Sequence, residues 1–150
     1  MIIIESMDLL SEYRGKLLGS SRWHTVEQRL VTAFAEVTDD HQGIHLNATD
    51  ARAAGFDKPI AHGYLLLSLL PGMAQQVYRV KGVSSKINYG LEHCRFINPV
   101  MVGAKVQAQF ALHDIRPKPQ GILLTVDATL NINQQSKPAL VARTLALLIP

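Results

Sequence analysis

Residues 64–78 read YLLLSLLPGMAQQVY, which places apolar side chains on nearly every side of a helix. A helix in a globular protein that lacks a polar face is normally buried on most sides. We therefore expect this segment to be the central helix of the fold. Pro71 lies inside it, and because proline removes a backbone hydrogen bond and clashes with the preceding turn, we predict a kink or a break there.

After Ser84 the apolar pattern changes to a period of two, which is typical of strands. The alternation covers residues 87–91, 106–112, 122–130 and 141–149. Turn signals separate these segments at Asn98-Pro99, at residues 116–121 and at residues 133–138. Because each is short enough for a hairpin, we predict a largely antiparallel sheet. The last strands also carry apolar residues on their second face. We therefore expect a partner subunit or the N-terminal helices to pack against this face of the sheet.

The segment before the central helix is predicted to hold a short strand and two helices. We expect the strand at residues 22–25, followed by a helix that Thr25 and Gln28 close with a capping box and whose apolar positions run from Val26 to Val37. A second short helix is predicted to begin at Asn47 or Thr49 and to stop at Gly55. An early strand, a buried helix and then several long antiparallel strands together predict an α+β fold of the hotdog type, a sheet wrapped around a central helix.

Composition is that of one ordinary domain over residues 1–150, with 47% hydrophobic and 18% charged residues. A single cysteine, Cys94, excludes an internal disulfide and argues against a cysteine-built zinc site, so we expect a reducing, cytoplasmic setting. The N-terminal residues MIIIESMDLL lack the basic region of a secretory signal. The apolar run at residues 64–70 is too short to span a bilayer, so no membrane association is expected.

The charge distribution indicates which kinds of partner the protein is expected to bind. The formal net charge is +3 and the isoelectric point is about 9.2. Lysine and arginine residues are scattered and form no basic stripe interleaved with aromatic residues, so we do not expect a nucleic-acid partner. A modest positive field suits a small anionic ligand.

Two short motifs carry the chemistry: TDDHQGIH at residues 38–45 and KPIAHG at residues 58–63. Asp40 and His45 are five positions apart with Gly43 between them, a separation that a turning loop brings together but a helix face does not. Histidine exchanges protons near neutral pH, and a nearby carboxylate can fix its tautomer or share a water molecule. Gly63 precedes the central helix, where free backbone N–H groups and the positive helix end can face a developing oxyanion. We therefore predict Asp40, His45 and Gly63 as site residues.

Other interpretations of these residues remain open. An Asp-Asp-His turn can simply cap a helix. His41 and His45, together with Asp40, have a spacing seen in metal sites, but an HExxH motif and a third nearby histidine are missing, so we expect no metal. His62 is interpreted as a loop histidine that fixes the turn. Ser68 lacks a G-x-S-x-G context and is not expected to be a hydrolase nucleophile.

Three stretches resemble a known family: FAEVTDDHQGIH at 34–45, PIAHG at 59–63 and INYGLEHCRFINPV at 87–100. Together they resemble the MaoC-like dehydratases, or R-specific enoyl-CoA hydratases, and most closely their nodulation-protein-N-like branch. Two motifs in the right order and at the right separation are more specific than either one alone. The resemblance implies reversible hydration of trans-2-enoyl-CoA to (R)-3-hydroxyacyl-CoA by a homodimer, with an acyl-CoA substrate and no metal or redox cofactor.

The family pattern G-D-x-N-P-x-H falls on this sequence with two identities, Asp40 and His45. Asp39, Gln42 and Gly43 stand where that pattern has glycine, asparagine and proline. The nodulation-like branch also has glutamine at the position of Gln42, but it carries a bulky aromatic residue where this chain has Gly43, so we expect a more mobile loop. Either Asp40 or His45 can accept the proton in this interpretation.

Two alternative functions fit the same resemblance. A hotdog thioesterase would bind the same acyl-CoA but direct water at the thioester carbonyl. A non-catalytic acyl-binding module would keep the fold while its loop changed, as Asp39 and Gly43 allow. A serine that assists the water site in some hydratases aligns with Pro71, so Ser68 is not expected to take that role.

Overall fold

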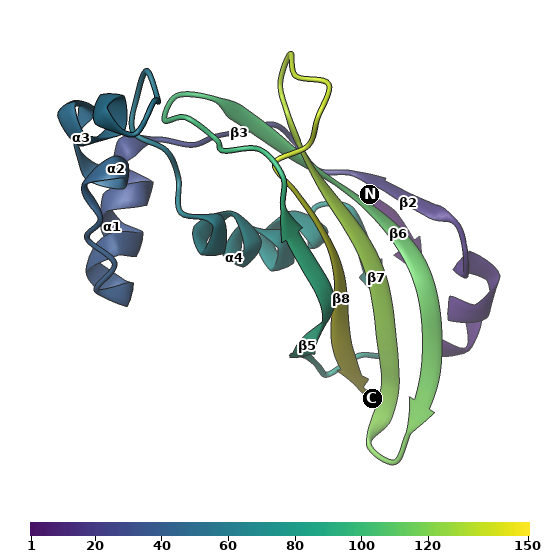
Figure 1. Cartoon of the computed structure of the whole chain (residues 1–150). Helices are drawn as coiled ribbons and strands as arrows, with labels where there is room; N and C mark the ends of the chain where they lie inside the picture. Colours follow the sequence, from purple (N-terminus) through teal and green to yellow (C-terminus); the bar gives the residue numbers. More distant parts are fainter.

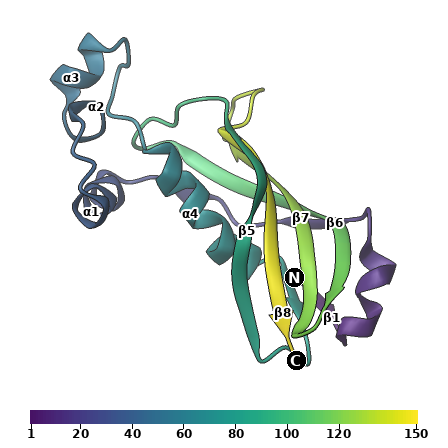
Figure 2. The ribbon, with the colours of Figure 1, turned by 60° about the horizontal axis from the view of Figure 1, so that its bottom comes forward.

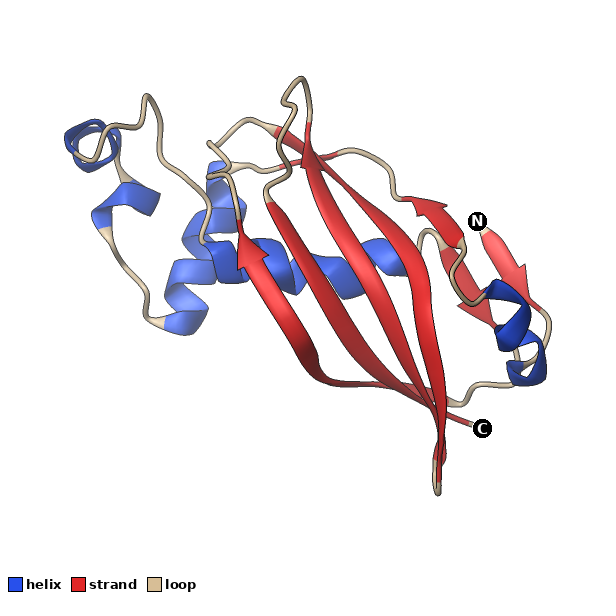
Figure 3. Ribbon diagram, turned by 45° about the vertical axis from the view of Figure 1, so that its right-hand side comes forward, coloured by secondary structure: helices blue, strands red, loops and turns tan.

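The computed structural model describes residues 1–150 and confirms an α+β hotdog arrangement, in which α4 (Gly63–Ala74) lies across one face of a long curved sheet (Figures 1 and 3). The sheet runs in the order β2 (Leu17–Ser20), β6 (Lys105–Lys118), β7 (Gly121–Ile132), β8 (Leu140–Ile149), β5 (Ser85–Phe96). A two-residue strand, β3 (His24–Thr25), pairs with β6, and every pairing in this sheet is antiparallel. β1 (Ile2–Ile4) and β4 (Tyr78–Val80) form a separate parallel pair that the sequence pattern did not predict.

The predicted central helix is confirmed by its burial. Its side chains join the main hydrophobic core with the inward-facing residues of the sheet; the buried helix residues are Leu65, Leu66, Leu70, Met73 and Ala74. The helix runs through Pro71 without a break and ends at Ala74, so the predicted break is wrong. Pro71 falls in the last turn, where little helix follows the missing hydrogen bond. No helix of the structure is both long and apolar enough to cross a membrane.

The four long strands are confirmed, but one predicted hairpin is wrong. The turn signal at Asn98-Pro99 does not join paired neighbours, because β5 pairs with β8 and not with β6. One edge of β6 is occupied by β7 and the other by β2 and β3, so β5 can join the sheet only at its far side. The predicted turn at 116–121 is also too long, since Lys118 already pairs with Gly121.

The N-terminal helices stand beyond one end of α4, away from the sheet (Figures 1 and 2). They are α1 (Gln28–Thr38), α2 (Gly43–Leu46) and α3 (Ala48–Ala53), while the short 3-10 helix η1 (Met7–Tyr13) lies near β2 at the opposite side. The predicted cover of the second sheet face by the N-terminal helices is therefore wrong. A partner subunit remains as the predicted cover.

The predicted start of α1 needs correction. The residue that precedes the helix is Glu27, Thr25 belongs to β3, and no capping box forms. Gln28 instead donates from Nε2 to the main-chain oxygen of His45 at 2.9 Å. Val37, predicted to lie on the apolar face, is 85% exposed, because the buried face of the helix is formed by Val31 and Ala35.

The second predicted helix is confirmed as α3. Asn47 caps it by accepting a hydrogen bond from the backbone N–H of Asp50 at 2.9 Å. Gly55 follows with φ of 90°, a left-handed conformation that glycine adopts without a steric penalty.

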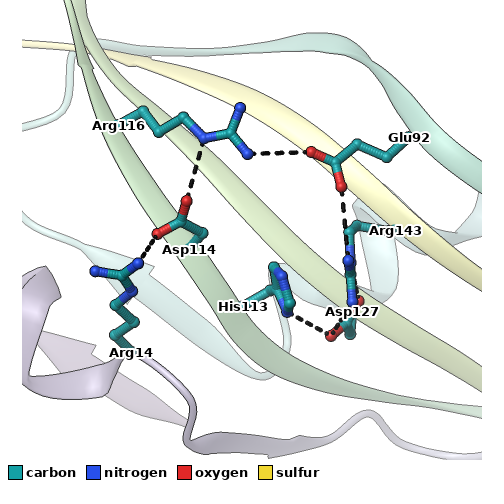
Figure 4. A network of polar contacts seen from close by, with 7 residues as sticks. All are labelled: Arg14, Glu92, His113, Asp114, Arg116, Asp127 and Arg143. Atoms are coloured by element: carbon teal, nitrogen blue, oxygen red, sulfur yellow. Dashed lines mark hydrogen bonds and ion pairs between the residues drawn. The ribbon is translucent and has the colours of Figure 1, made fainter.

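A network of ion pairs occupies the sheet face opposite α4 (Figure 4). Asp127 lies between the core residues Val126 and Ala128 on β7, so its side chain points to the other face. Its carboxylate accepts from Arg143 at 2.7 Å, and Arg143 in turn lies 3.7 Å from Glu92. The drawn network has seven members: Arg14, Glu92, His113, Asp114, Arg116, Asp127 and Arg143.

This network predicts a loss of stability in acid. Burial raises the pKa of Asp127, but the hydrogen bond and charge of Arg143 outweigh it, so the folded-state pKa lies below the ordinary value. A hydrogen bond from Arg116 likewise lowers the pKa of Asp114. Because unfolded aspartate titrates at about 3.9, the unfolded chain binds more protons near that pH; the stabilisation is complete well above pH 4 and is lost as the pH falls through the folded pKa values.

We expect the melting temperature of Asp127→Asn to fall less steeply than that of the wild type as the pH is lowered from about 6 to about 3. Circular dichroism melts across this range measure the two slopes. Asp57→Asn, at an exposed carboxylate, is the matched control and should keep the wild-type slope. Equal slopes for Asp127→Asn and the wild type would contradict this role of the network.

Candidate active site

The sequence predicted that His45 lies in a turning loop. In the structure it lies on the one-turn helix α2. The side chain is 7% exposed, and its Nδ1 lies 2.7 Å from the main-chain oxygen of Ile60. A carbonyl oxygen only accepts, so we assign the proton to Nδ1, and Nε2 is left with its lone pair. The Gln28 side chain holds the main chain of the same residue. Ring and backbone of His45 are therefore both fixed.

Asp40 follows a residue in a left-handed conformation. Asp39 ends α1 with φ of 57°, a helix-ending position that glycine favours and that aspartate tolerates better than most residues. This conformation accounts for a glycine in the family pattern at that position. It turns the chain so that a carboxylate oxygen of Asp40 and a ring nitrogen of His45 lie within 4.8 Å. The predicted convergence of Asp40 and His45 is thus present in the structure.

Gly43 begins α2 in close contact with α3. A Cβ atom built on it would lie 1.7 Å from Oδ2 of Asp50, whose carboxylate accepts a hydrogen bond from the Asn47 side chain at 2.8 Å. No side chain fits at this position without moving Asp50. Glycine at this position therefore leaves room for the Asp50 side chain, which is exposed on α3.

His62 belongs to the same cluster, which the sequence interpretation missed. It is 2% exposed, and its Nε2 lies 3.0 Å from the main-chain oxygen of Asp40 and 4.0 Å from the carboxylate. Its ring stacks on that of His45, with centroids 3.8 Å apart and planes at 25°. Its position beside Gly63 in the PIAHG motif was the only signal in the sequence.

Asp40, His45 and His62 each offer one ligand atom within 4.8 Å of the others, but the stacked rings of the two histidines do not suit a single metal ion. An ion bound by histidine lies in the plane of the ring, about 2.0–2.1 Å from the nitrogen. Two rings stacked at 3.8 Å with planes at 25° do not direct their nitrogens to one such point. His41, the other candidate ligand, is exposed, lies 3.4 Å from Asp39 and is not a member of this cluster. That the protein uses no metal stays a prediction.

Gly63 begins α4 beside His45. The two residues line a pocket of about 300 Å³, together with Leu66 and Phe96 among others. The first backbone N–H groups of a helix have no partner within the helix, so those of α4 are available to a ligand in this pocket. A Cβ atom on Gly63 would lie 3.0–3.1 Å from the Phe96 ring. Asp40 and His62 stand next to His45, so all three predicted site residues belong to one region.

A second, larger pocket of about 350 Å³ lies further along α4. It is bounded by the helix residues Leu67, Leu70, Pro71 and Ala74 on one side and by β5 and the inner face of the sheet on the other. Ser68 also borders it, but its hydroxyl donates to the main-chain oxygen of Tyr64 at 2.7 Å. That Ser68 is not a nucleophile stays a prediction.

Comparison with known proteins identifies the family. The model of the MaoC-like domain matches residues 12–133. The chain belongs to the MaoC-like domain family. It is 40% identical over 146 residues to 3-hydroxyacyl-thioester dehydratase Z of Mycobacterium tuberculosis, with 97% of each chain covered. Nodulation protein N of Rhizobium meliloti is 38% identical over 145 residues, with 95% and 90% covered.

Two further comparisons concern hydratases from Aeromonas caviae. Its (R)-specific enoyl-CoA hydratase is 36% identical over 96 residues, which cover 63% of this chain and 69% of the relative. The solved structure of the (R)-hydratase from A. caviae involved in PHA biosynthesis superposes with a TM-score of 0.72 and 27% identity, covering 88% and 96%. Both the MaoC-like resemblance and the predicted hotdog fold are thereby confirmed.

Proposed function

We propose that this protein reversibly hydrates trans-2-enoyl-CoA to (R)-3-hydroxyacyl-CoA. Membership of a family of hydratases and dehydratases supports the reaction type. The observation that carries the proposal is the distance between the Asp40 carboxylate and the His45 ring, at most 4.8 Å. One water molecule can hydrogen-bond to both atoms across such a gap, because each bond is about 2.7–3.0 Å long.

The proposed reaction assigns a task to each residue. Asp40 and His45 hold one water molecule and take one of its protons as its oxygen bonds to C3 of the substrate. The electron pair of the C2–C3 double bond moves toward the thioester oxygen and then forms a C–H bond at C2 with a returned proton. The backbone N–H at the start of α4, beside Gly63, stabilises the charge that develops on the thioester oxygen.

The larger pocket is the proposed site of the acyl chain. It follows α4 from Leu67 to Ala74, and residues 63 and 71 are about 12 Å apart along a helix axis at 1.5 Å per residue. Ten of its 16 lining residues are hydrophobic, as an alkyl chain requires. A thioester at the N-terminus of α4 would place its chain along this helix.

The test is a hydration assay with purified protein and trans-2-enoyl-CoA substrates of increasing chain length. Loss of the enoyl absorbance without release of free thiol, and formation of the (R) alcohol on a chiral column, is the expected result. Thiol release instead would indicate a thioesterase. Binding of every substrate without turnover would indicate an acyl-binding module and overturn the proposal.

We also propose that two copies pair through β5. This strand forms one edge of the sheet, is 12 residues long and is exposed along nearly its whole length. Ile87, Tyr89 and Leu91 on it are 50%, 54% and 44% exposed. A long apolar edge strand offers unpaired backbone groups to another strand. Because Tyr89 and Leu91 also line the larger pocket, a second β5 would help to enclose it.

Leu91→Glu is expected to convert this dimer to a monomer, since a charged residue on an edge strand opposes edge-to-edge pairing. Light scattering coupled to size-exclusion chromatography measures the mass. Val37→Glu is the matched control, because it places the same charge at an apolar residue that is 85% exposed on α1. A wild-type protein that elutes as a monomer would refute the pairing directly.

A further inference from the structure

His62 contacts both residues that we assign to the water molecule. Its Nε2 lies 3.0 Å from the main-chain oxygen of Asp40, and its ring face lies against the ring of His45 at 3.8 Å. On another side the Phe34 ring lies 5.1 Å away at a tilt of 53°. With 2% of its surface exposed, His62 has no room to change its orientation without disturbing these neighbours.

The hydrogen bonds of His62 fix which nitrogen carries the proton. A carbonyl oxygen accepts and does not donate, so the contact with Asp40 requires a proton on Nε2. Nδ1 then holds a lone pair, and this atom is buried without a hydrogen-bond partner. An unpaired buried acceptor costs free energy, so the other contacts of the ring must offset this cost in the folded protein.

The two contacts of His62 have different effects on the site. The N–H donated to Asp40 fixes the main chain that carries the carboxylate. The stacked ring closes one face of the His45 imidazole, whose edge is already fixed by Ile60. Contacts at an edge and at a face oppose rotation and tilting of the ring, so they hold the His45 nitrogen that lies within 4.8 Å of the Asp40 carboxylate.

We propose that His62 is a positioning residue that aligns Asp40 through its N–H and His45 through its ring, without contacting the substrate. The proposal rests on the proposed function, because the alignment serves a water molecule held by those two side chains. Displacements of about 1 Å at a reacting group cost up to about 10²-fold in rate. We therefore expect His62 to contribute about 10- to 100-fold to the rate.

Two substitutions separate the two contacts. His62→Phe keeps an aromatic ring against His45 and removes the N–H, while His62→Gln can keep an N–H for Asp40 and removes the ring. We expect each to lower kcat about 10- to 100-fold with KM changed less than about threefold, since the acyl-binding surfaces are untouched. His24→Gln, at an exposed histidine on β3, is the control and should retain wild-type kinetics.

Double substitutions distinguish positioning from a general structural role. If His62 acts through Asp40, His62→Phe should cost little further activity in an Asp40→Asn background, and His62→Gln should cost little in a His45→Asn background. The same fold-loss in every background would overturn the proposal. So would wild-type kcat in both single variants.

A spectroscopic measurement tests the alignment of the two histidines independently of enzymatic activity. Imidazole ¹⁵N NMR of the wild-type protein should show His62 as the Nε2–H tautomer and His45 as the Nδ1–H tautomer, and His62→Gln should broaden or split the His45 signals. If the wild type hydrates no enoyl thioester, the proposed function fails while this measurement still tests the alignment. Nδ1–H on His62, or unchanged His45 signals in His62→Gln, would overturn the alignment itself.

Discussion

Replacing His45 with asparagine should lower kcat/KM for enoyl-thioester hydration about 10²–10⁴-fold, the range that general acid–base groups contribute. Asparagine can still donate a hydrogen bond to the Ile60 carbonyl, which lies 2.7 Å from Nδ1 in the wild type. It lacks the basic Nε2, so the substitution removes the proton acceptor and keeps the anchor. Initial rates from the loss of enoyl absorbance measure the effect.

Asp40→Asn should show a loss in the same range, because it removes the charge and keeps the shape of the side chain. The two residues are expected to act on one water molecule, so the double variant should lose little more than either single one. Adjacent controls are available in His41→Asn and Asp39→Asn, which alter exposed neighbours, and asparagine tolerates the left-handed conformation of residue 39. Fully additive losses in the double variant would argue against a shared water molecule.

Gly63→Val should lower turnover about 10²-fold without unfolding the protein. The Cβ atom of the added side chain would lie 3.0–3.1 Å from the Phe96 ring, so the side chain would push against this ring and narrow the pocket at the backbone N–H groups of α4. Loss of an oxyanion donor typically costs about 10²–10³-fold. Steady-state kinetics and a thermal melt on the same sample separate activity from folding.

Gly72→Val is the control for that substitution. Gly72 lies in the same helix, and a Cβ atom there meets nothing within 4 Å. The control should keep wild-type turnover, so a loss confined to Gly63→Val would be due to the position and not to valine in the helix. Wild-type turnover in Gly63→Val would remove Gly63 from the proposed site.

The elements that could be predicted are those whose pattern is local. The all-round apolar run of α4 and the period of two in β5 to β8 depend on neighbouring residues only, and both are confirmed. The partner of β5 could not be predicted, because pairing with β8 depends on which edges the other strands leave free. The Thr25 cap was wrong for a similar reason: pairing with β6 placed that residue in a strand.

In the candidate site too, the residues in local motifs could be predicted and the tertiary contacts could not. Asp40, His45 and Gly63 were predicted from two motifs, and the structure brings them into one region. His62 was assigned to the turn alone, because stacking on a ring 17 positions earlier and bonding to a distant carbonyl are tertiary contacts with no periodic pattern. The break predicted at Pro71 was wrong, since the penalty for an internal proline is small where a helix is about to end.

The strand order has a consequence for folding. β8 follows the other strands in the sequence, yet it lies between β5 and β7 and pairs with both. Without β8, β5 has no neighbour in the sheet. We therefore expect β5 to join the sheet late in folding, because its place depends on a strand that lies far along the chain.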